Sequence, residues 1–371
     1  MKCLILVGGF GTRLRPLTFT VTKPLVPFCN KPIVEHQIAA AVKAGVKHVI
    51  LAVGWKADDM QEAIEVLKAR YDIEITCSIE EFPLGTAGPI RLAEKIIREG
   101  GANEPFFVFN SDVICDFPLL QMLEFHRSHG GEGTICVTQV EDPSKYGVVV
   151  SSSSGRIERF VEKPSVFISD RINAGLYILN KSVIDRIDSG VFRMIETDVF
   201  PRIAADGKLF SFNLQGYWAD IGQPRDFLRG MKMHLAHLSK GGDHSPRSRL
   251  SQGIEGGEVR GGTVLVGTNS SIGAGSSIGP NVVIGNNCVV GRGVRLSNTT
   301  LLDNTVIADF ATVNESFLGW NNRVGRWAKV DNLTVTGEDV GFAEEVFING
   351  AIVLPHKVIK ERILESGKIV M

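Results

Sequence analysis

The sequence lacks any long uninterrupted apolar run. No hydrophobic stretch approaches the roughly 20 residues that a membrane span needs. Near the N-terminus only the four apolar residues from Leu4 to Val7 precede Gly8, too few for a signal peptide. The formal net charge is −1, because 40 Lys and Arg face 41 Asp and Glu. We therefore expect no membrane and no nucleic-acid partner.

Other familiar patterns are missing as well. The six cysteines include no C-x-x-C pair, so neither a zinc site nor a disulfide framework is indicated. Scattered, reduced thiols suit a cytoplasmic protein, which is the location we expect. The chain also has no G-x4-G-K-[ST] loop, and Leu14 stands where a dinucleotide fingerprint would have its third glycine.

A glycine-rich turn follows the first apolar run. Leu4 to Val7 has the fully apolar composition of a strand buried on both faces. Gly8, Gly9 and Gly11 then allow a sharp turn whose backbone N–H groups can face an anion. Arg13 and Lys23 add a forked and a compact cation. This stretch predicts a polyphosphate site.

Strands and helices alternate up to about residue 112. We expect strands at 46–54, 73–80 and 106–110, and helices at 31–45, 58–70 and 87–99. Such alternation predicts right-handed crossovers and a mostly parallel sheet covered on both faces. Ligands bind beyond the carboxyl ends of such strands. The glycine turn, Glu80 and Asp112 all fall there.

From Gly133 onward the regular alternation of strands and helices gives way to a series of strands. We expect strands at 134–140, 147–151, 156–161, 172–179 and 209–214, with helices at 196–205 and 224–238. They form a substrate lobe that completes the same sheet. The polar stretch that follows predicts a domain linker, so we divide the chain into a catalytic domain (1–240), a linker (241–253) and a second domain (254–371).

The second domain contains an internal repeat. Aliphatic residues recur every six positions from Val266 to Leu302, then slip and resume at Leu318 and again at Val340. A hexad of this kind predicts a left-handed parallel β-helix, in which each aliphatic side chain fills a corner of the coil. The predicted fold class is thus α/β: a Rossmann-like mixed, mostly parallel sheet followed by a left-handed β-helix.

The motifs resemble one known family. The run G-G-x-G-T-R-L-x-P-L-T at Gly8 to Thr18, followed by Lys23-Pro24, resembles the signature of nucleotidylyltransferases that make nucleoside-diphosphate sugars. Phe160-Val-Glu-Lys-Pro164, Asn173-Ala-Gly175 and Trp218-Ala-Asp-Ile-Gly222 follow in the family's order and narrow the resemblance to the GDP-mannose pyrophosphorylases. The chain departs from the family's pattern at Thr22, where proline is common, and at Phe82, where an acidic residue is expected.

The resemblance implies a reaction: GTP and mannose 1-phosphate give GDP-mannose and pyrophosphate, with Mg²⁺ as cofactor. It implies that the catalytic groups are Arg13, Lys23 and Lys163. It implies nucleotide contacts at Leu6, Gly8, Gly9, Gly11, Thr12, Arg13, Glu80, Pro83, Gly85 and Asn110. It implies sugar-phosphate contacts at Asp112, Gly147, Glu162, Lys163 and Asn173, and metal ligands at Asp112 and Asp220.

The sequence also leaves other functions open. An adenylyl- or uridylyltransferase for glucose 1-phosphate shares the glycine loop. A non-catalytic scaffold relative shares the architecture, but such relatives usually lose the charged loop residues that are present here. An acyltransferase in the β-helix needs a placed histidine, and only His356 lies beyond the linker. Solenoid ends usually dock on another surface, so we expect a homo-oligomer.

Overall fold

The computed structural model describes residues 1–9, 11–54, 60–99, 101, 104–240, 258–259 and 263–371. Contacts divide them into two compact units. The first unit comprises residues 1–9 and 34–218, and the second comprises the described residues of 10–33 and 219–371. The predicted linker at 241–253 lies outside the described residues. The three-part division stays a prediction.

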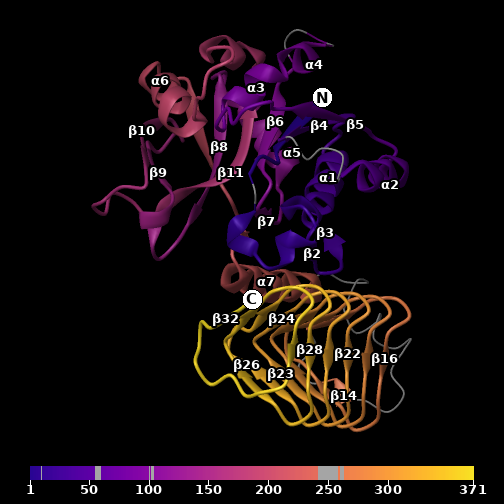
Figure 1. Ribbon diagram of the computed structural model, residues 1–371. Coiled ribbons are helices and arrows are strands. Elements are labelled where there is room, and N and C mark those ends of the chain that lie inside the picture. Colours follow the sequence, from indigo (N-terminus) through magenta and orange to yellow (C-terminus); the bar gives the residue numbers. More distant parts are fainter. Residues whose placement is uncertain (10, 55–59, 100, 102–103, 241–257, 260–262) are drawn as a thin grey trace. The chain divides into compact units, whose positions relative to one another are not determined.

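The first unit is built around a nine-stranded mixed sheet. Its parallel part runs in the order β6 (Phe106–Asn110), β1 (Lys2–Leu6), β4 (His48–Val53) and β5 (Glu74–Ile79). These strands lie side by side in Figure 1. Alternate residues such as Leu4, Ile50 and Val108 pack in one core with residues of the helices between 87 and 98. Ile5 and Leu51, which point to the opposite face, are equally buried. Both faces are therefore covered, as the apolar strands predict.

The remaining strands gather around β11 (Arg171–Leu179), which runs antiparallel to β6. β11 also pairs with β8 (Gly133–Gln139) and β9 (Gly147–Ser151), both antiparallel. β10 (Ile157–Glu162) adds to β9, and β12 (Leu209–Asn213) runs parallel to β8. The predicted fold class, a mixed sheet followed by a β-helix, is confirmed.

Helices and short segments complete the first unit. The α-helices are α1 (Ile33–Lys43), α2 (Gln61–Tyr71), α3 (Gly88–Leu92), α4 (Glu94–Arg98), α5 (Leu119–His129) and α6 (Phe200–Ala205). Short elements are β7 (Val113–Cys115) and the 3-10 helix η6 (Lys181–Arg186). None of the helices in the described part of the chain combines the length and apolar composition of a bilayer crossing.

Two predicted helices are broken in the structure. The helix expected at 87–99 divides at Ala93, whose ψ of 6° leaves the helical region. The helix expected at 196–205 is a π-helical turn, η7 (Ile195–Val199), followed by α6. Pro201 in the first turn of α6 has no N–H to continue the preceding turn, so a new helix starts there.

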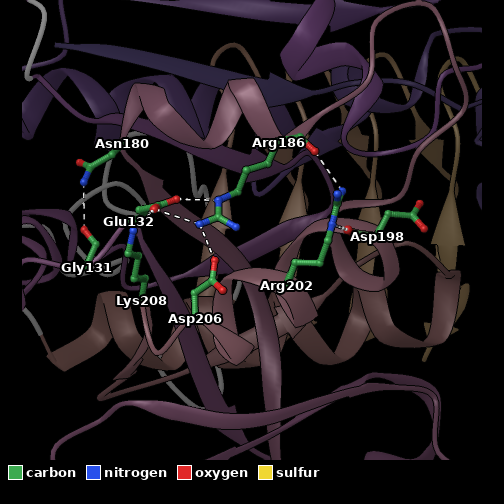
Figure 2. Close-up of polar contacts among 8 residues, drawn as sticks. All are labelled: Gly131, Glu132, Asn180, Arg186, Asp198, Arg202, Asp206 and Lys208. Carbon is green, nitrogen blue, oxygen red and sulfur yellow. Dashed lines mark hydrogen bonds and ion pairs between the residues drawn. The ribbon is translucent and has the colours of Figure 1, made fainter.

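A network of charged groups ties β8 to the segments around it (Figure 2). The Glu132 carboxylate accepts two hydrogen bonds from Arg186, at 2.8 and 3.0 Å, and one from Lys208 at 2.9 Å. Arg186 also lies 2.7 Å from Asp206. The Arg186 guanidinium is the main reason that the pKa of Glu132 lies below its usual range.

A closed circuit of neutral groups lies beside that network. Gly131 N–H donates to His129 Nδ1 (2.9 Å), so the His129 proton sits on Nε2 and is donated to Thr134 Oγ1 (2.7 Å). Thr134 in turn donates to His126 Nδ1 (2.9 Å), and His126 Nε2 donates to Asn180 Oδ1 (3.0 Å). Asn180 Nδ2 donates to the Gly131 carbonyl oxygen at 2.9 Å, the contact drawn in Figure 2, and this bond closes the circuit. Each donor has one acceptor only if both imidazoles are uncharged.

The second unit contains the β-helix, whose strands form three all-parallel sheets. The first sheet comprises β14 (Glu258–Val259), β17 (Ser277–Ile278), β20 (Arg295–Ser297), β23 (Thr312–Asn314), β26 (Lys329–Asp331) and β29 (Phe347–Asn349). The second comprises β15 (Val264–Val266), β18 (Val282–Ile284), β21 (Thr299–Leu301), β24 (Phe317–Leu318), β27 (Val335–Thr336), β30 (Ile352–Val353) and β32 (Ile369–Val370). The third comprises β16 (Ser271–Ile272), β19 (Val289–Val290), β22 (Val306–Ile307), β25 (Arg323–Val324), β28 (Gly341–Phe342) and β31 (Val358–Ile359). Figure 1 shows them as stacked coils from orange to yellow.

The coils explain where the hexad slips. Val264 pairs with Val282, 18 residues on, whereas Ile284 pairs with Leu301, only 17 residues on. Leu301, not the predicted Leu302, therefore continues the stacked column in the core. The prediction of Leu302 was wrong by one position, because only two residues separate Leu296 from Thr299, whereas three separate Ile278 from Val282 one coil earlier.

Asparagine side chains stack at the corners of the coils. Seven of them have positive φ: Asn269, Asn281, Asn287, Asn298, Asn304, Asn321 and Asn332. Their amides bond from coil to coil, as in Asn281 to Asn298 (3.0 Å) and Asn332 to Asn349 (2.9 Å). Asparagine tolerates the left-handed region, and each amide satisfies the next.

Residues 11–33 and helix α7 (Pro224–Lys240) belong to the same unit as the β-helix. The rings of Phe28 and Phe227 lie 5.1 Å apart, and Phe227 packs on Phe317 of β24 at 4.6 Å. Asn30 Nδ2 donates to the Ile284 carbonyl at 2.8 Å. The segment after the glycine turn is thus supported by repeat residues, which the sequence pattern did not predict.

Candidate active site

The parallel strands of the first unit place several predicted residues at one edge. Leu6, the last residue of β1, pairs with Asn110, the last residue of β6. Val7 N–H donates to the Ala52 carbonyl at 2.9 Å, and Ser111 N–H donates to the Leu6 carbonyl at 3.3 Å. Gly8 and Asp112 follow directly. The carboxyl edge of the sheet therefore carries the start of the glycine turn and one predicted metal ligand.

Glu80 lies against the glycine turn. A Cβ placed on Gly8 would be 3.5 Å from Glu80 Oε1, so the carboxylate faces the bare backbone of Gly8. Its other oxygen, Oε2, accepts the Leu84 N–H at 3.1 Å. Burial raises the pKa of Glu80, and the Leu84 N–H partly opposes that rise. The structure thus brings two predicted nucleotide residues, Gly8 and Glu80, together.

The segment around Pro83 and Gly85 is fastened to residues 193–195. A Cβ on Gly85, whose φ is 79°, would lie 2.3 Å from the Arg193 carbonyl oxygen. Arg193 N–H donates to the Leu84 carbonyl at 3.0 Å, and Ala87 N–H donates to the Arg193 carbonyl at 2.9 Å. Close backbone packing therefore requires glycine at position 85 whatever its contact with a nucleotide.

Gly147, Glu162 and Lys163 form a compact group. Gly147 pairs with Glu162 across β9 and β10, and a Cβ on Gly147 would lie 2.7 Å from Glu162 Oε2. Lys163 Nζ lies 2.9 Å from Glu162 Oε1. Lys163 has a φ of 44°, a conformation that costs a lysine roughly 1 kcal/mol and is typical of functional positions. A carboxylate and a cation are thus held side by side on a half-exposed edge.

Asn173 stands at an irregularity of β11. The pairing of β11 with β8 shifts between Asn173 and Tyr177. Asn173 Nδ2 donates to Tyr177 Oη at 2.8 Å, and its Oδ1 accepts the Gly175 N–H at 2.9 Å. Trp218 Nε1 donates to the Ala174 carbonyl at 2.9 Å. Bulges next to active sites re-aim side chains in this way, and here the bulge fixes Asn173.

Gly175 allows β11 and β6 to approach each other. Its φ is 75°, and a Cβ there would lie 2.9 Å from Asn110 Nδ2. The predicted residues Asn110 and Asn173 are therefore joined through one bulge, since Gly175 touches both.

Two groups near this site were missed by the sequence reasoning. The Glu196 side chain is buried in the π-helical turn and accepts a hydrogen bond from Thr86 Oγ1 at 2.5 Å. Burial raises the pKa of Glu196, and the nearby Glu162 carboxylate adds to the rise. Tyr177 is fully buried beneath Asn173. No sequence signal marks either residue; the π-helical turn that holds Glu196, a kind of turn frequent at functional sites, is seen only in the structure.

The other predicted residues belong to the second unit. A Cβ on Gly11 (φ 60°) would lie 3.0 Å from Lys23 Cβ, and Thr18 Oγ1 donates to the Gly11 carbonyl at 2.8 Å. Thr12 and Arg13 lie in the 3-10 turn that starts at Gly11. The loop therefore folds Lys23 back onto Gly11.

The metal ligands can be tested against the donor chemistry. Asp220 ends the short strand β13 (Trp218–Asp220), and its Oδ1 accepts the Gly222 N–H at 2.9 Å, which orients the carboxylate. Across the residues that the structure describes, no three His, Cys, Asp or Glu side chains form a metal cluster. Mg²⁺ needs only one or two carboxylates when substrate phosphates supply the other oxygens. Asp112 and Asp220 supply carboxylates of the kind such an ion takes, and their role as its ligands stays a prediction.

Comparison with known proteins places the chain. Residues 2–236 match the nucleotidyl transferase family, and residues 260–370 match the GMPPB C-terminal domain. The chain is 51% identical to the mannose-1-phosphate guanyltransferase of Hypocrea jecorina over 365 residues, which cover 98% of each chain. This chain belongs to the nucleotidyl transferase family. A Xenopus laevis protein, mannose-1-phosphate guanyltransferase beta-B, is likewise 51% identical, over the full length of both chains.

Solved structures agree in fold. A putative glucose-1-phosphate thymidylyltransferase from Bacillus anthracis matches with a TM-score of 0.58 at 22% identity, over 66% of this chain and 98% of that one. At that identity the likeness speaks for the fold alone. Enzymes of this family work with a divalent metal.

Proposed function

We propose that this protein transfers GMP from GTP to mannose 1-phosphate, giving GDP-mannose and pyrophosphate. The observation that supports this function most strongly is the 51% identity to mannose-1-phosphate guanyltransferases over 98–100% of the chain. The charged residues that such a reaction needs (Arg13, Lys23, Asp112, Lys163 and Asp220) are all present. A catalyst is therefore favoured over a scaffold.

The reaction needs no side-chain nucleophile. An oxygen of the mannose 1-phosphate, already an anion at neutral pH, attacks the α-phosphorus of GTP. The bond from that phosphorus to the oxygen bridging the β-phosphate breaks, and pyrophosphate leaves with those electrons. The protein's task is to align the two substrates and stabilise charge.

Lys163 and Glu162 are proposed to hold the sugar phosphate. Their 2.9 Å ion pair places a cation for the phosphate beside a carboxylate for sugar hydroxyls. Gly147 leaves the room that the Glu162 carboxylate occupies, and Asn173 is fixed by Tyr177 and Gly175 to present a polar wall.

The phosphates of GTP are assigned to the loop. Backbone N–H groups at Gly8, Gly9, Gly11 and Thr12, together with Arg13 and Lys23, suit a polyphosphate. Mg²⁺ is proposed as the metal on Asp112 and Asp220, where it would neutralise charge on the phosphate oxygens. Leu6, Pro83, Gly85 and Asn110 are proposed to line the nucleotide.

Glu80 is proposed to read the base. A carboxylate can accept from both N1–H and the exocyclic amine of guanine, whereas adenine offers a lone pair at N1. Because Oε2 is engaged by Leu84, Oε1 is the oxygen directed to the glycine turn. In Glu80→Gln the Leu84 N–H would retain the amide oxygen and turn the NH₂ group outward, toward the base.

A substrate matrix tests the proposal. Pyrophosphate release would be measured with four nucleoside triphosphates and several sugar 1-phosphates. We expect GTP with mannose 1-phosphate to give the highest kcat/KM, and Glu80→Gln to lower the GTP-to-ATP ratio by about a hundredfold, because unpaired buried groups discriminate strongly. An unchanged ratio would place base recognition elsewhere, and a different best pair would overturn the proposed reaction.

We also propose that the protein forms a homo-oligomer in the cytoplasm. The final strands β31 and β32 end the stacked coils and leave strand edges of the kind that proteins usually cover. A monodisperse monomer at micromolar concentration in light scattering would contradict the oligomer.

A further inference from the structure

A cavity of about 380 Å³ lies within the second unit, between α7 and two corners of the β-helix. We call it the α7 cavity. From α7 it is lined by Arg225, Leu228, Arg229, Lys232 and Met233. From the coils it is lined by Glu315, Asn332 and Leu333. Its volume is within the range of small-molecule sites.

The charges around the α7 cavity are unbalanced. Arg225, Arg229 and Lys232 recur at spacings of four and three, so they share one face of α7. Glu315 is the single acidic residue of the lining. None of the three cations has an ion-pair partner among the residues described for this chain, whereas Arg292 and Lys329 of the coils pair with Asp309 and Asp331. A net positive cavity on a chain of charge −1 suits an anion.

The helix gains nothing from these cations by itself. Like charges at i and i+4 destabilise a helix by about 0.2–0.5 kcal/mol. Arg225 also stands in the first turn of α7, where the helix dipole favours negative charge. An anion in the cavity would reverse both effects, because it would lie between the cations and near that end of the helix.

The opposite wall is held in an unusual conformation. Leu333 has a φ of 61°, and a bulky residue in the left-handed region is a genuine outlier. Its N–H donates to the Glu315 carbonyl at 2.7 Å, which fixes the corner. Leu333 from the coils, together with Leu228 and Met233 from α7, adds apolar surface to the lining beside the cations.

We propose that the α7 cavity binds a small phosphorylated molecule. The phosphate groups lie against Arg225, Arg229 and Lys232, and the remainder of the molecule packs on Leu333 and Met233. The site involves none of the residues assigned to the reaction, so it stands whether or not the proposed function does.

The probe for this site is inorganic pyrophosphate, with EDTA present and no divalent metal. Hydrogen exchange of the full chain locates the bound anion. Slower exchange is expected in peptides covering 225–233 and 331–335. Slower exchange confined to residues 1–30 reports binding elsewhere and counts against the proposal.

Variants decide between a site and a diffuse charge effect. Arg229→Ala with Lys232→Ala should weaken pyrophosphate binding at 225–233 at least tenfold, whereas Arg229→Lys should keep it within threefold. Lys240→Ala, on the exposed end of α7 and outside the cavity, is the matched control and should change nothing. Because all these side chains are partly or fully exposed, the fold should survive, and thermal unfolding checks it. Equal binding in the double variant, or equal loss with Lys240→Ala, would overturn the proposal.

Discussion

The two parts of the molecule satisfy their interior polar groups with different chemistry. The sheet of the first unit uses titratable groups, as in the circuit of His126, His129 and Thr134. The coils of the β-helix rely mainly on side-chain amides, as in the ladder from Asn281 to Asn298, with carboxylates such as Asp331 accepting some of their hydrogen bonds. The circuit occurs once and depends on each member, whereas the ladder repeats along the stack. We therefore expect the first arrangement to depend more strongly on pH than the second, because its imidazoles can take up protons.

Replacing one glycine in each unit by alanine should give the largest difference in activity between the two parts of the molecule. Gly147→Ala should lower kcat/KM for mannose 1-phosphate about a hundredfold, because the added Cβ lies 2.7 Å from Glu162 Oε2 and would displace it. Gly341→Ala in β28 is the matched change, since its Cβ meets nothing closer than 3.7 Å. We expect its kinetics to be those of the unaltered protein. Steady-state kinetics of both variants checks this, and similar losses would show that Gly147 has no special relation to Glu162.

Replacing one lysine in each unit by alanine should give the next largest difference. Lys163→Ala should raise the KM for mannose 1-phosphate by about thirty- to a hundredfold and change the KM for GTP far less, because a charge-assisted contact is worth about 2–3 kcal/mol. Lys329→Ala removes a comparable cation beside Asp331 on the β-helix, 3.2 Å away, and should alter neither constant. Equal damage to both substrates in Lys163→Ala would refute the sugar-phosphate role.

Buried threonines test the chemistry of the two interiors. Thr134→Val should lower the free energy of unfolding by about 2–3 kcal/mol, because it leaves two imidazole nitrogens unpaired. Thr336→Val, whose hydroxyl donates to Asn322 Oδ1 at 2.7 Å, should cost a similar amount in the β-helix. Denaturant unfolding measures both.

The pH dependence should separate these regions. Burial lowers the pKa of both histidines, to about 4 for His129. In the unfolded chain they take up protons near pH 6.5, so the free energy of unfolding of the first unit should fall as pH decreases from about 6.5 toward 4, by at most about 1.4 kcal/mol per pH unit for each imidazole. Hydrogen exchange should show α5 and β8 losing protection in this window while the coils keep theirs. The reverse order would contradict the neutral circuit.

The smallest expected effect concerns the loop at Thr22. Thr22 already has the φ of a proline, −65°, and its Oγ1 is buried without a hydrogen-bond partner in the described structure. Thr22→Pro should therefore stabilise the protein by about 0.5–1 kcal/mol through the unfolded state. A rise of a few degrees in Tm checks this, and a fall would show that position 22 needs its N–H.

Much of the fold was predictable because local patterns and tertiary structure agree. The apolar strands at 4–7 and 106–110 and the hexads of the β-helix follow directly from periodicity. The pattern failed at Leu302, because the corner between Leu296 and Thr299 has one residue fewer than the corner of the preceding coil, which a six-residue period does not predict.

The candidate site was predictable only where a motif names its residues. Glu162 and Lys163 adjoin in sequence, and Gly8 meets Glu80 because strand ends share an edge. Glu196 was missed because its hydrogen bond to Thr86 joins residues 110 positions apart, and no local sequence pattern indicates such a contact. The support of residues 11–33 by Phe227 and Ile284 was missed for the same reason.

The asparagine columns bear on how the protein ages. Asn349 precedes Gly350, the pair most prone to deamidation, in which the glycine nitrogen attacks the side-chain carbonyl. Here Asn349 Nδ2 donates to the Leu364 carbonyl at 2.7 Å, and its Oδ1 accepts from Asn332. Gly350 N–H is engaged by the Asp331 carbonyl at 3.0 Å. Neighbouring coils therefore hold both the Asn349 side chain and the Gly350 nitrogen in place. We expect the stack that gives the β-helix its shape also to slow deamidation at this pair.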